Sequence, residues 1–336
     1  MNCPNSIEST PVTSPKSFTN WAGNINFTSS QSFRPTTRGE IVEIIRMAEE
    51  QNRKVKWTGS RWSFMQSFVS DDIVIESDNI KGKINQNLII DNLIPILTEE
   101  GKALLRQGLL VHIKGGTKIF NVNRILHGLE MVANDVFHTI DDDEFRLIHN
   151  TRERTEDGVI FLDIVEKAMI TLGGSGGQSI AGAISSGTHG GDIRTRPIAD
   201  AVVAIHLIGP GGQEWWIEKS NGRLTVGTEE VTRSLLQTIA NNGTGADAEI
   251  CQHIMVKKDD NFFNSVLVSL GRMGFIYSLV INTTSAYKLT ERRVDNTWET
   301  YFREKLSSNE IFSNYIRNDS IRYLNVIIMP DRKSVV

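Results

Sequence analysis

Residues 173–192 read GGSGGQSIAGAISSGTHGGD and place eight glycines among twenty residues. Glycine loses more conformational freedom on folding than any other residue, so such a cluster in a folded chain needs a physical reason. One reason is a series of tight turns. Another is a ligand that lies against bare backbone, with amide N–H groups and small hydroxyls facing it. The interspersed serines and threonines favour a ligand with anionic oxygens, which such a surface binds well.

Two other interpretations of this segment are weaker. A flexible Gly/Ser linker would lack the apolar residues at 180–184, which predict a short buried helix. A dinucleotide fingerprint would need a third glycine where Ser179 follows Gly174 and Gly176, and residues 169–171 make a poor buried strand before it. No Gly-Lys-Ser/Thr follows, so the segment is not a Walker A loop.

A second informative segment lies upstream, at residues 37–64. Thr37 and Glu40 predict a capping box at the start of a helix that reaches Asn52, and apolar residues recur at helical spacing inside it. A short strand over residues 54–57 and a small-residue turn follow.

The turn that begins at Thr58 is rich in hydrogen-bond donors. Its backbone N–H groups, the Ser60 and Ser63 hydroxyls and Arg61 could together cradle a diphosphate. Taken alone this is a weak signal, because most Gly-Ser turns are only turns.

Four segments together resemble the FAD-linked oxidases of the vanillyl-alcohol oxidase and p-cresol methylhydroxylase type, and most closely the sugar-lactone and alditol oxidases. Asn20–Asn24 resembles the family's opening strand, and Gly59–Phe64 its first diphosphate loop. Gly177–Gly190 follows the second flavin loop almost residue for residue, and Leu270–Ile276 resembles a strand entry beside the flavin. The resemblance runs from about Trp21 to Tyr287.

The resemblance implies an α+β fold: a two-subdomain FAD-binding domain followed by an incomplete substrate (cap) domain. It divides the chain into a disordered tail (1–19), an FAD-binding domain (20–285, with subdomains at about 20–95 and 105–285) and the start of a truncated cap (286–336). The cofactor-binding residues that it implies are Thr58, Gly59, Ser60, Arg61, Trp62, Ser63, Phe64, Gly174, Gly177, Ser179, Gly182, Ser186, Gly187, Thr188, His189, Gly274 and Ile276.

The flavin is expected to be bound non-covalently. The family often links it to a histidine of the first loop, where this chain has Trp62, and tryptophan has no nucleophilic ring nitrogen. Cys3 and Cys251 lie outside the loops in which the family makes its second type of linkage. Trp62 could instead pack an aromatic face on the flavin.

Two further departures concern the length of segments. An acidic, irregular insertion is expected at about 134–170; mixed charge favours a solvated surface, and a lid or partner-binding loop is the alternative. After Tyr287 we expect one helix at 297–306 and one apolar strand at 323–329. The family's C-terminal His-Trp-x-Lys segment is absent from the sequence, so the catalytic residues stay unknown.

By resemblance, the chain oxidises a CH–OH group of a sugar, polyol or lactone by hydride transfer to flavin N5, and O₂ is the expected acceptor. Two alternatives remain open at this stage. One is a flavin-binding subunit whose partner chain carries the substrate site, and the other is a truncated, inactive fragment.

The composition of the 336 residues, with 39% hydrophobic and 23% charged residues, is ordinary for a soluble globular protein. A net charge of −4 without a basic tract argues against nucleic acid as a partner. No metal-ligand spacing occurs among the seven histidines, and only His189 closes a predicted cofactor loop. Without an apolar leader or a long apolar run, a cytoplasmic protein with no membrane span is the default expectation.

Periodicity predicts the remaining elements. We expect strands over residues 72–76, 108–114, 202–208, 214–217 and 275–283, helices after the turn 115–117 and over 231–240, and a hairpin turn at 209–212.

Overall fold

The computed structural model describes residues 15–84, 90–131, 152–156, 159–163, 167–192, 194–222, 224–242, 250 and 253–287. Beyond these it describes residues 296–297, 303, 308, 313, 317, 321–323, 328–329 and 334–335. Cys3, Cys251 and most of the predicted helix at 297–306 lie outside the described residues.

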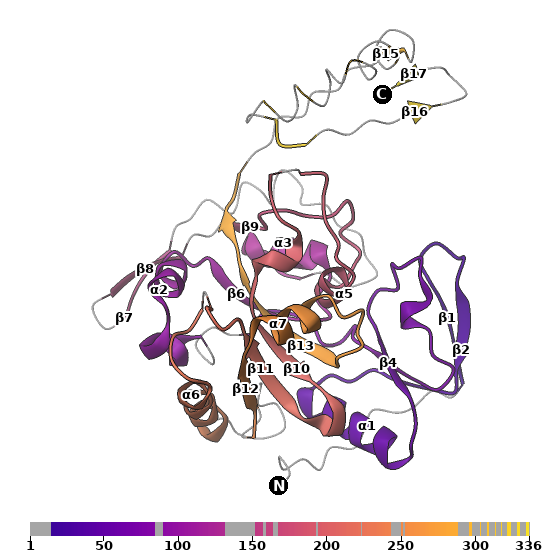
Figure 1. Cartoon of the computed structure of the whole chain (residues 1–336), viewed down its shortest axis with the longest axis horizontal. Coiled ribbons are helices and arrows are strands. Elements are labelled where there is room, and N and C mark those ends of the chain that lie inside the picture. The colour runs from indigo at the N-terminus through magenta and orange to yellow at the C-terminus, as the bar shows by residue number, and fades with distance from the viewer. Residues whose placement is uncertain are drawn as a thin grey trace.

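The chain forms a mixture of helices and strands (Figure 1). The α-helices are α1 (Arg38–Glu50), α2 (Glu99–Arg106), α3 (Ile119–Leu126), α5 (Ile180–Ser185), α6 (Glu229–Asn242) and α7 (Asp260–Leu267). Short 3-10 helices are η1 (Gln66–Phe68), η3 (Asp91–Ile96), η4 (Ile198–Ala201) and η5 (Pro210–Gly212).

Most described strands form two sheets and a hairpin. The larger sheet has the order β12-β11-β10-β13-β6, the smaller has the order β3-β5-β4, and β1 pairs with β2. Their bounds are β1 (Lys16–Thr19), β2 (Asn26–Ser29), β3 (Gln31–Phe33), β4 (Val55–Thr58), β5 (Ile73–Glu76), β6 (Leu110–Lys114), β10 (Val202–Ile208), β11 (Glu214–Glu218), β12 (Met255–Lys258) and β13 (Phe275–Asn282).

Seven short strands make peripheral pairs. β7 (Arg152–Glu156) pairs with β8 (Val159–Asp163), β9 (Lys167–Ala168) pairs with β14 (Thr284–Ser285), and β17 (Ser334–Val335) pairs with β15 (Asn296–Thr297) and β16 (Ile328–Met329).

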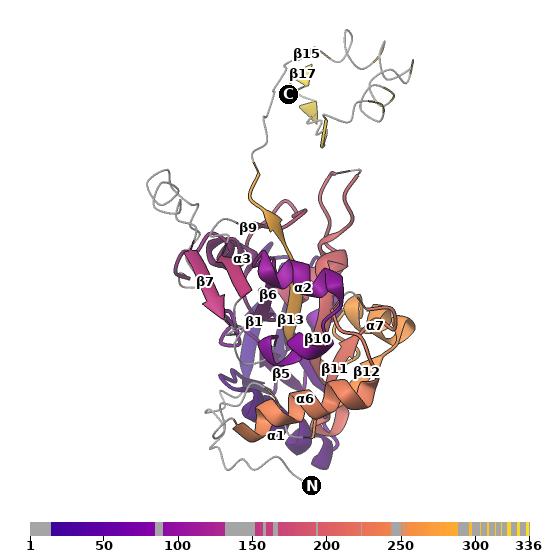
Figure 2. The same cartoon turned by 90° about the vertical axis from the view of Figure 1, so that its left-hand side faces the viewer.

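The larger sheet separates two layers of apolar packing (Figures 1 and 2). One face packs with α1, η3, α2, α6 and the small sheet, and the other with α3, α5 and α7. Every residue of β10 is buried because β11 and β13 flank it and both of its faces are covered. The larger sheet is mixed, because β11 and β12 run parallel whereas its other neighbouring strands run antiparallel.

Local sequence explains why α1 begins where it does. The Thr37 hydroxyl accepts from the amide of Glu40 at 3.3 Å, and the Glu40 carboxylate accepts from the amide of Thr37 at 3.2 Å. This is the predicted capping box. The apolar stripe of α1, which includes Ile41 and Ile45, is buried in the same apolar cluster as residues of the small sheet.

Three expectations about the N-terminal half are wrong. Lys16–Thr19 is not part of a disordered tail, since it pairs with Asn26–Ser29 as β1. Asn20–Asn24 is not a strand but the turn of this hairpin, in which the amide of Gly23 donates to the Asn20 carbonyl at 3.0 Å. The insertion at 134–170 is not irregular throughout, because it contains the antiparallel pair β7–β8.

Candidate functional site

A cavity of about 180 Å³ lies where the small sheet meets the larger one. Residues 57–63 enter it from the carboxyl end of β4, and Ser77 enters from the carboxyl end of β5. Parallel strands bring their carboxyl ends to the same edge, so two segments distant in sequence reach one place. Residues 178–186, which include α5, and residues 270–276, which lead into β13, form the other walls.

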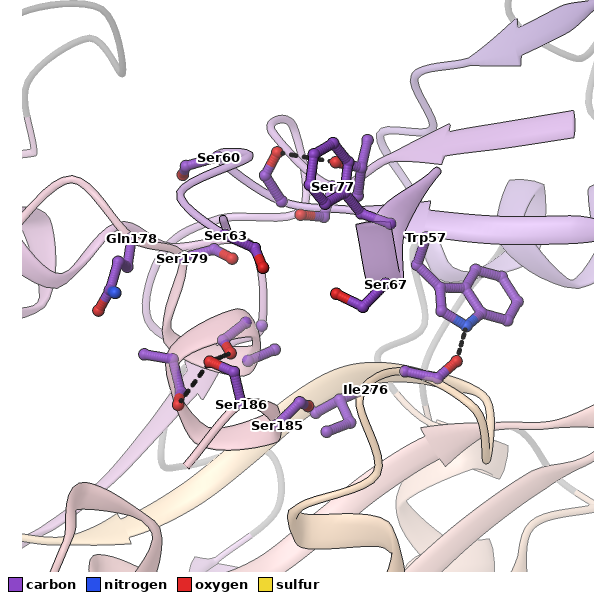
Figure 3. Close-up of a pocket in the computed structure, with 18 of the residues that line it drawn as sticks. Trp57, Ser60, Ser63, Ser67, Ser77, Gln178, Ser179, Ser185, Ser186 and Ile276 are labelled. Carbon is purple, nitrogen blue, oxygen red and sulfur yellow. Dashed lines mark hydrogen bonds between the residues drawn. The ribbon is translucent and has the colours of Figure 1, made fainter. Parts of the chain in front are cut away.

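The two glycine-containing loops touch inside this cavity. A Cβ atom at Gly59 would lie 2.1 Å from Ser179 Oγ, so the contact requires glycine. Figure 3 shows Ser63 and Ser67 on one side of the open space and Ser185 and Ser186 on the other. Bare backbone and small hydroxyls therefore line part of the cavity, and the aromatic rings of Trp57, Trp62, Phe68 and Phe275 line another part.

Hydrogen bonds join the walls to the sheets. The Trp57 indole donates to the carbonyl of Gly271 at 2.8 Å, which links β4 to the segment before β13 (Figure 3). The amide of Gly115 donates to Tyr277 O at 2.8 Å, and the carbonyl of Gly115 accepts from the amide of Ala181 at 3.0 Å. Gly115 thus ties β13 to the start of α5.

The structure brings most of the predicted site residues together and leaves the others outside. Those lining the cavity are Thr58, Gly59, Ser60, Arg61, Trp62, Ser63, Ser179, Gly182, Ser186, Gly274 and Ile276. Those outside the described lining are Phe64, Gly174, Gly177, Gly187, Thr188 and His189.

The outlying residues have identifiable surroundings. Phe64 is 65% exposed and meets Trp21 edge-on at 5.6 Å between ring centroids. His189 is exposed, and its Nδ1 lies 2.9 Å from the carbonyl oxygen of Gly190. Gly177 packs against the Trp62 indole. A Cβ atom at this position would lie 2.2 Å from Trp62 Cζ2, which is too close for any residue but glycine.

Trp62 also stacks on Trp21, with ring centroids 4.7 Å apart and an angle of 15° between the planes. One of its faces is therefore covered by the β1–β2 hairpin. A flavin could contact Trp62 only through the part of the indole that Trp21 does not cover.

Sequence reasoning placed no site at five of the lining residues, which are Trp57, Ser67, Phe68, Ser77 and Gly115. Seven others belong to the two later segments that resemble flavin-binding ones but were not named individually, and they are Gln178, Ala181, Ala183, Ser185, Leu270, Gly271 and Phe275. For Gly115 a signal existed, since it belongs to the Gly-Gly-Thr turn at 115–117. Ser67 and Ser77 carry no such local signal, because only the return of β5 beside β4 brings Ser77 to the cavity.

One expectation about the glycine-rich segment needs correction. Several of its amides face the fold and not a ligand: Ile180 N donates to Thr117 O at 2.8 Å, and Ala183 N donates to Ser179 O at 2.8 Å. The helix α5 and its two flanking residues line the cavity with three serines, Ser179, Ser185 and Ser186, and with Ala181, Gly182 and Ala183.

The first loop, in contrast, holds unsatisfied polar groups. The amides of Ser60, Arg61 and Ser63 donate to no group among the described residues. Ser60 Oγ, Arg61 Nη1 and Gln178 Oε1 are buried and have no hydrogen-bond partner in the part of the chain that is described. Buried polar groups are normally hydrogen-bonded, so these atoms indicate a polar ligand.

Arg61 also has an unusual backbone conformation, with a φ of 55°. Its Nη1 lies 3.5 Å from Glu76 Oε2, and Glu76 is 1% exposed. Burial raises the pKa of the Glu76 carboxyl, but hydrogen bonds from Arg34 and Lys16 outweigh it and hold the pKa below its ordinary value. Glu76 is therefore a carboxylate at neutral pH.

A second cavity, of about 230 Å³, lies between residues 169–171 and 194–201. It shares no lining residue with the first. No cluster of three or more histidine, cysteine or acidic side chains suited to a metal ion occurs within the described ranges. Nor does any helix in those ranges combine the length and the apolar character needed to cross a bilayer.

Comparisons with known proteins include a relative found by sequence. No protein-family model matches the chain. D-arabinono-1,4-lactone oxidase of Candida glabrata is 26% identical over 205 residues, which are 61% of this chain and 30% of that protein. The chain thus spans about a third of the length of the relative that it matches.

Solved structures give weaker likenesses. Cholesterol oxidase from B. sterolicum covers 84% of this chain at 13% identity and a TM-score of 0.48, with 39% of that enzyme covered. Its His121Ala variant, from Brevibacterium sterolicum, covers 85% at 12% identity and the same TM-score, with 40% covered. The sequence match to the lactone oxidase confirms that this chain resembles the FAD-linked oxidases of the vanillyl-alcohol oxidase and p-cresol methylhydroxylase type.

Proposed function

We propose that this chain is the flavin-binding part of an FAD-dependent oxidoreductase that oxidises a CH–OH group of a sugar, polyol or lactone, with O₂ as the acceptor. The observation that carries the proposal is the contact of the two glycine-containing loops at Gly59 and Ser179 inside one cavity. These are the same two loops on which the resemblance to flavin oxidases rests. The sequence relative is a lactone oxidase, which favours this substrate class.

The polar groups of the cavity suit a dinucleotide with a diphosphate. The free amides of Ser60 and Ser63 and the unpaired Ser60 hydroxyl are donors, which anionic oxygens accept. The side-chain amide of Gln178 can donate or accept, so it suits the edge of a ring that carries both kinds of group. Non-covalent binding follows from Trp62, which occupies the position of the linking histidine.

The size of the cavity limits what it encloses. Sites for drug-sized ligands measure roughly 300–1,000 Å³, and this cavity measures about 180 Å³. We therefore assign the enclosed part to the centre of the cofactor, where the donors are, and the ends of the cofactor to the open rim.

Bound FAD would supply the acceptor for the hydride of the substrate alcohol. The chain's own contribution is to bind and orient the cofactor. The described lining contains no carboxylate, histidine, lysine or tyrosine, so the base that takes the hydroxyl proton belongs outside this lining. His189 is not favoured for that role, because it is exposed and lies against the carbonyl of Gly190.

The test is the visible spectrum of the purified chain, recorded before and after acid precipitation. Flavin bands that move to the supernatant are the expected result, followed by bleaching of the bands under nitrogen when a lactone or polyol is added. Bands that stay with the pellet would contradict non-covalent binding. A colourless chain that also takes up no added FAD would overturn the proposed function.

A further inference from the structure

The two ends of the glycine-rich segment 173–192 lie side by side. A Cβ atom at Gly190 would lie 2.4 Å from the carbonyl oxygen of Leu172, and one at Gly173 would lie 2.5 Å from Cγ2 of Thr188. The middle of the segment, around α5, lines the first cavity. The segment is therefore a loop closed at its base, and what holds the base also bears on the wall of that cavity.

Arg322 bridges this base from a distant part of the chain. Its guanidinium donates to the carbonyl oxygen of Ile170, just before the segment, and its Nε donates to Oδ2 of Asp192, the last residue of the segment, at 2.6 Å. The second cavity, of about 230 Å³, separates residues 169–171 from residues 194–201. Walls on opposite sides of an open cavity make no van der Waals contact across it, so the guanidinium joins parts of the base that packing leaves apart.

Tyr287 fixes the position of this guanidinium. The guanidinium carbon of Arg322 lies 4.4 Å from the centre of the Tyr287 ring, which makes a cation–π contact. The Tyr287 hydroxyl lies 3.2 Å from the carbonyl oxygens of both Met169 and Ile170, either of which can accept its proton. Tyr287 and Arg322 therefore bind the same short stretch of backbone before the glycine-rich segment.

Asp192 is held as the partner anion at the other end. Its Oδ1 accepts from the amide of Arg194 at 2.9 Å. Burial raises the pKa of Asp192, but hydrogen bonds, among them those from the Arg194 amide and from Arg322, outweigh it and hold the pKa below its ordinary value. The main chain docks as well, since Asp192 forms an antiparallel bridge with Tyr323 and Arg194 Nη1 donates to Ile321 O at 2.7 Å.

We propose that Arg322 is a positioning residue for the glycine-rich segment: by joining the two ends of the segment, it holds Ser179, Ser185 and Ser186 where they line the first cavity. The proposal rests on the proposed function and makes the docking of the C-terminal residues a condition for tight FAD binding. Arg322 itself lies outside the described lining of both cavities. A loop whose base opens has to be closed again when the ligand binds, and this ordering lowers the affinity.

The test is Arg322→Lys, which keeps the positive charge but lacks the planar fork that reaches both ends of the segment. We expect it to weaken FAD about three- to tenfold in calorimetric titrations, the equivalent of one lost hydrogen bond. Hydrogen exchange is measured on the chain without FAD. The amides of residues 173–192 should exchange about threefold faster or more in the variant, because the base of the segment opens more often.

Arg53→Lys is the matched control. Arg53 is 24% exposed, against 27% for Arg322, and it also pairs with an aspartate, Asp72, at 2.6 Å. Asp72 precedes β5, so this pair lies at the opposite end of the small sheet from the first cavity. The FAD affinity and the exchange of residues 173–192 should both stay within about twofold of the wild type.

The two measurements separate the possible failures. Faster exchange with unchanged FAD affinity in Arg322→Lys would overturn the positioning role, and unchanged exchange would overturn the bridge itself. Faster exchange that extends equally to β10 would also contradict a local bridge. A wild-type chain that takes up no FAD would overturn the proposed function and the positioning role with it, whereas faster exchange of residues 173–192 alone would then still support the bridge.

Discussion

At the residue scale, Gly116 illustrates how closely the backbone is packed beside the cavity. A Cβ atom there would lie 1.9 Å from Ser77 O and 2.6 Å from Ile80 O, and the amide of Gly116 donates to Ile80 O at 2.8 Å. Neither carbonyl can move aside without breaking the turn that carries Ser77 to the cavity.

We therefore expect Gly116→Ala to lower the free energy of unfolding by about 3 kcal/mol, at the upper end of overpacking costs. Denaturant titration followed by fluorescence measures it. Gly191→Ala is the control, because no atom lies within 4 Å of the added Cβ, and its stability should change by less than about 0.5 kcal/mol. Equal stability of the two variants would contradict the close approach at Gly116.

The sequence alone identified those site residues that lie in a continuous segment with a recognisable small-residue pattern. Residues 58–63 form one continuous turn, and the small-residue pattern around Ser179 and Gly182 is local too. Ser77 and Gly115 were missed as site residues because their place depends on β5 returning beside β4 and β6 pairing with β13. Phe64 and His189 were included by continuity, and the chain turns both away from the lining.

At the scale of elements, a buried ion pair connects α1 to the larger sheet. Arg38 at the start of α1 donates to Glu214 of β11, and Glu214 also lies 2.8 Å from Nε2 of His206 on β10. Arg38 and Glu214 are 4% and 2% exposed. Removing one charge of such a pair leaves the other buried without compensation.

Glu214→Gln should therefore destabilise the chain by about 3 kcal/mol, because the Arg38 charge loses its counter-ion. Thermal unfolding measured by circular dichroism would show it. Glu99→Gln removes a carboxylate from an exposed pair with Lys102 and should have no measurable effect. A neutral result for Glu214→Gln would mean that α1 docks on the sheet without this pair.

The pairing of β6 with β13 predicts a dependence of stability on pH. His112 is fully buried, and desolvation, with the nearby His206 and Lys114, lowers its pKa to about 3 from 6.5. Between these values the unfolded chain binds a proton that the folded chain does not. The contribution of His112 to stability is thus complete above pH 6.5 and decreases as the pH falls, by about 1.4 kcal/mol per unit.

Replacing His112 by glutamine removes this titration while keeping a polar partner for Ser278, which lies 2.8 Å from His112 Nε2. The wild-type free energy of unfolding should fall more steeply than that of His112→Gln between pH 6 and pH 4. Parallel pH profiles would contradict the predicted shift, since the other titrating groups are common to both chains.

Elements with a strong local pattern were predicted well. The capping box starts α1 at Arg38, β10 has the predicted bounds, and the turn after it leads into β11. The hairpin β1–β2 was missed for two reasons. Lys16–Thr19 is short and becomes a strand by pairing with Asn26–Ser29. The turn between these two strands had itself been predicted as a strand. The pair β7–β8 was missed because the charged residues of β7 read as solvated surface, although β8 carries the apolar run Val159–Leu162.

At the scale of the whole molecule, a mixture of helices and strands was predicted and is observed. The division into subdomains and a truncated cap remains a prediction, because it came from the resemblance and not from periodicity. The relative matches this chain over only 30% of its own length, so the activity of a complete enzyme stays within the proposal.

If the cavity binds FAD, the ligand must stabilise the whole fold by mass action. FAD at a hundred times its dissociation constant should raise the free energy of unfolding by about 2.7 kcal/mol, and the melting temperature should keep rising with concentration. NAD at the same concentration is the control, because the sequence argues against a nicotinamide site. An equal shift with NAD, or none with FAD, would contradict a flavin-selective cavity.

The larger sheet also has a consequence for biosynthesis. His112 of β6 meets Ser278 of β13 across 166 residues of chain, and Gly115 completes the cavity only when Tyr277 has arrived. At roughly 5–20 residues per second, β6 leaves the ribosome about 8–33 seconds before its partner strand. During that interval an apolar strand edge is open to association with other chains, so slower translation or scarce chaperones should reduce the yield of folded protein before any step of catalysis is affected.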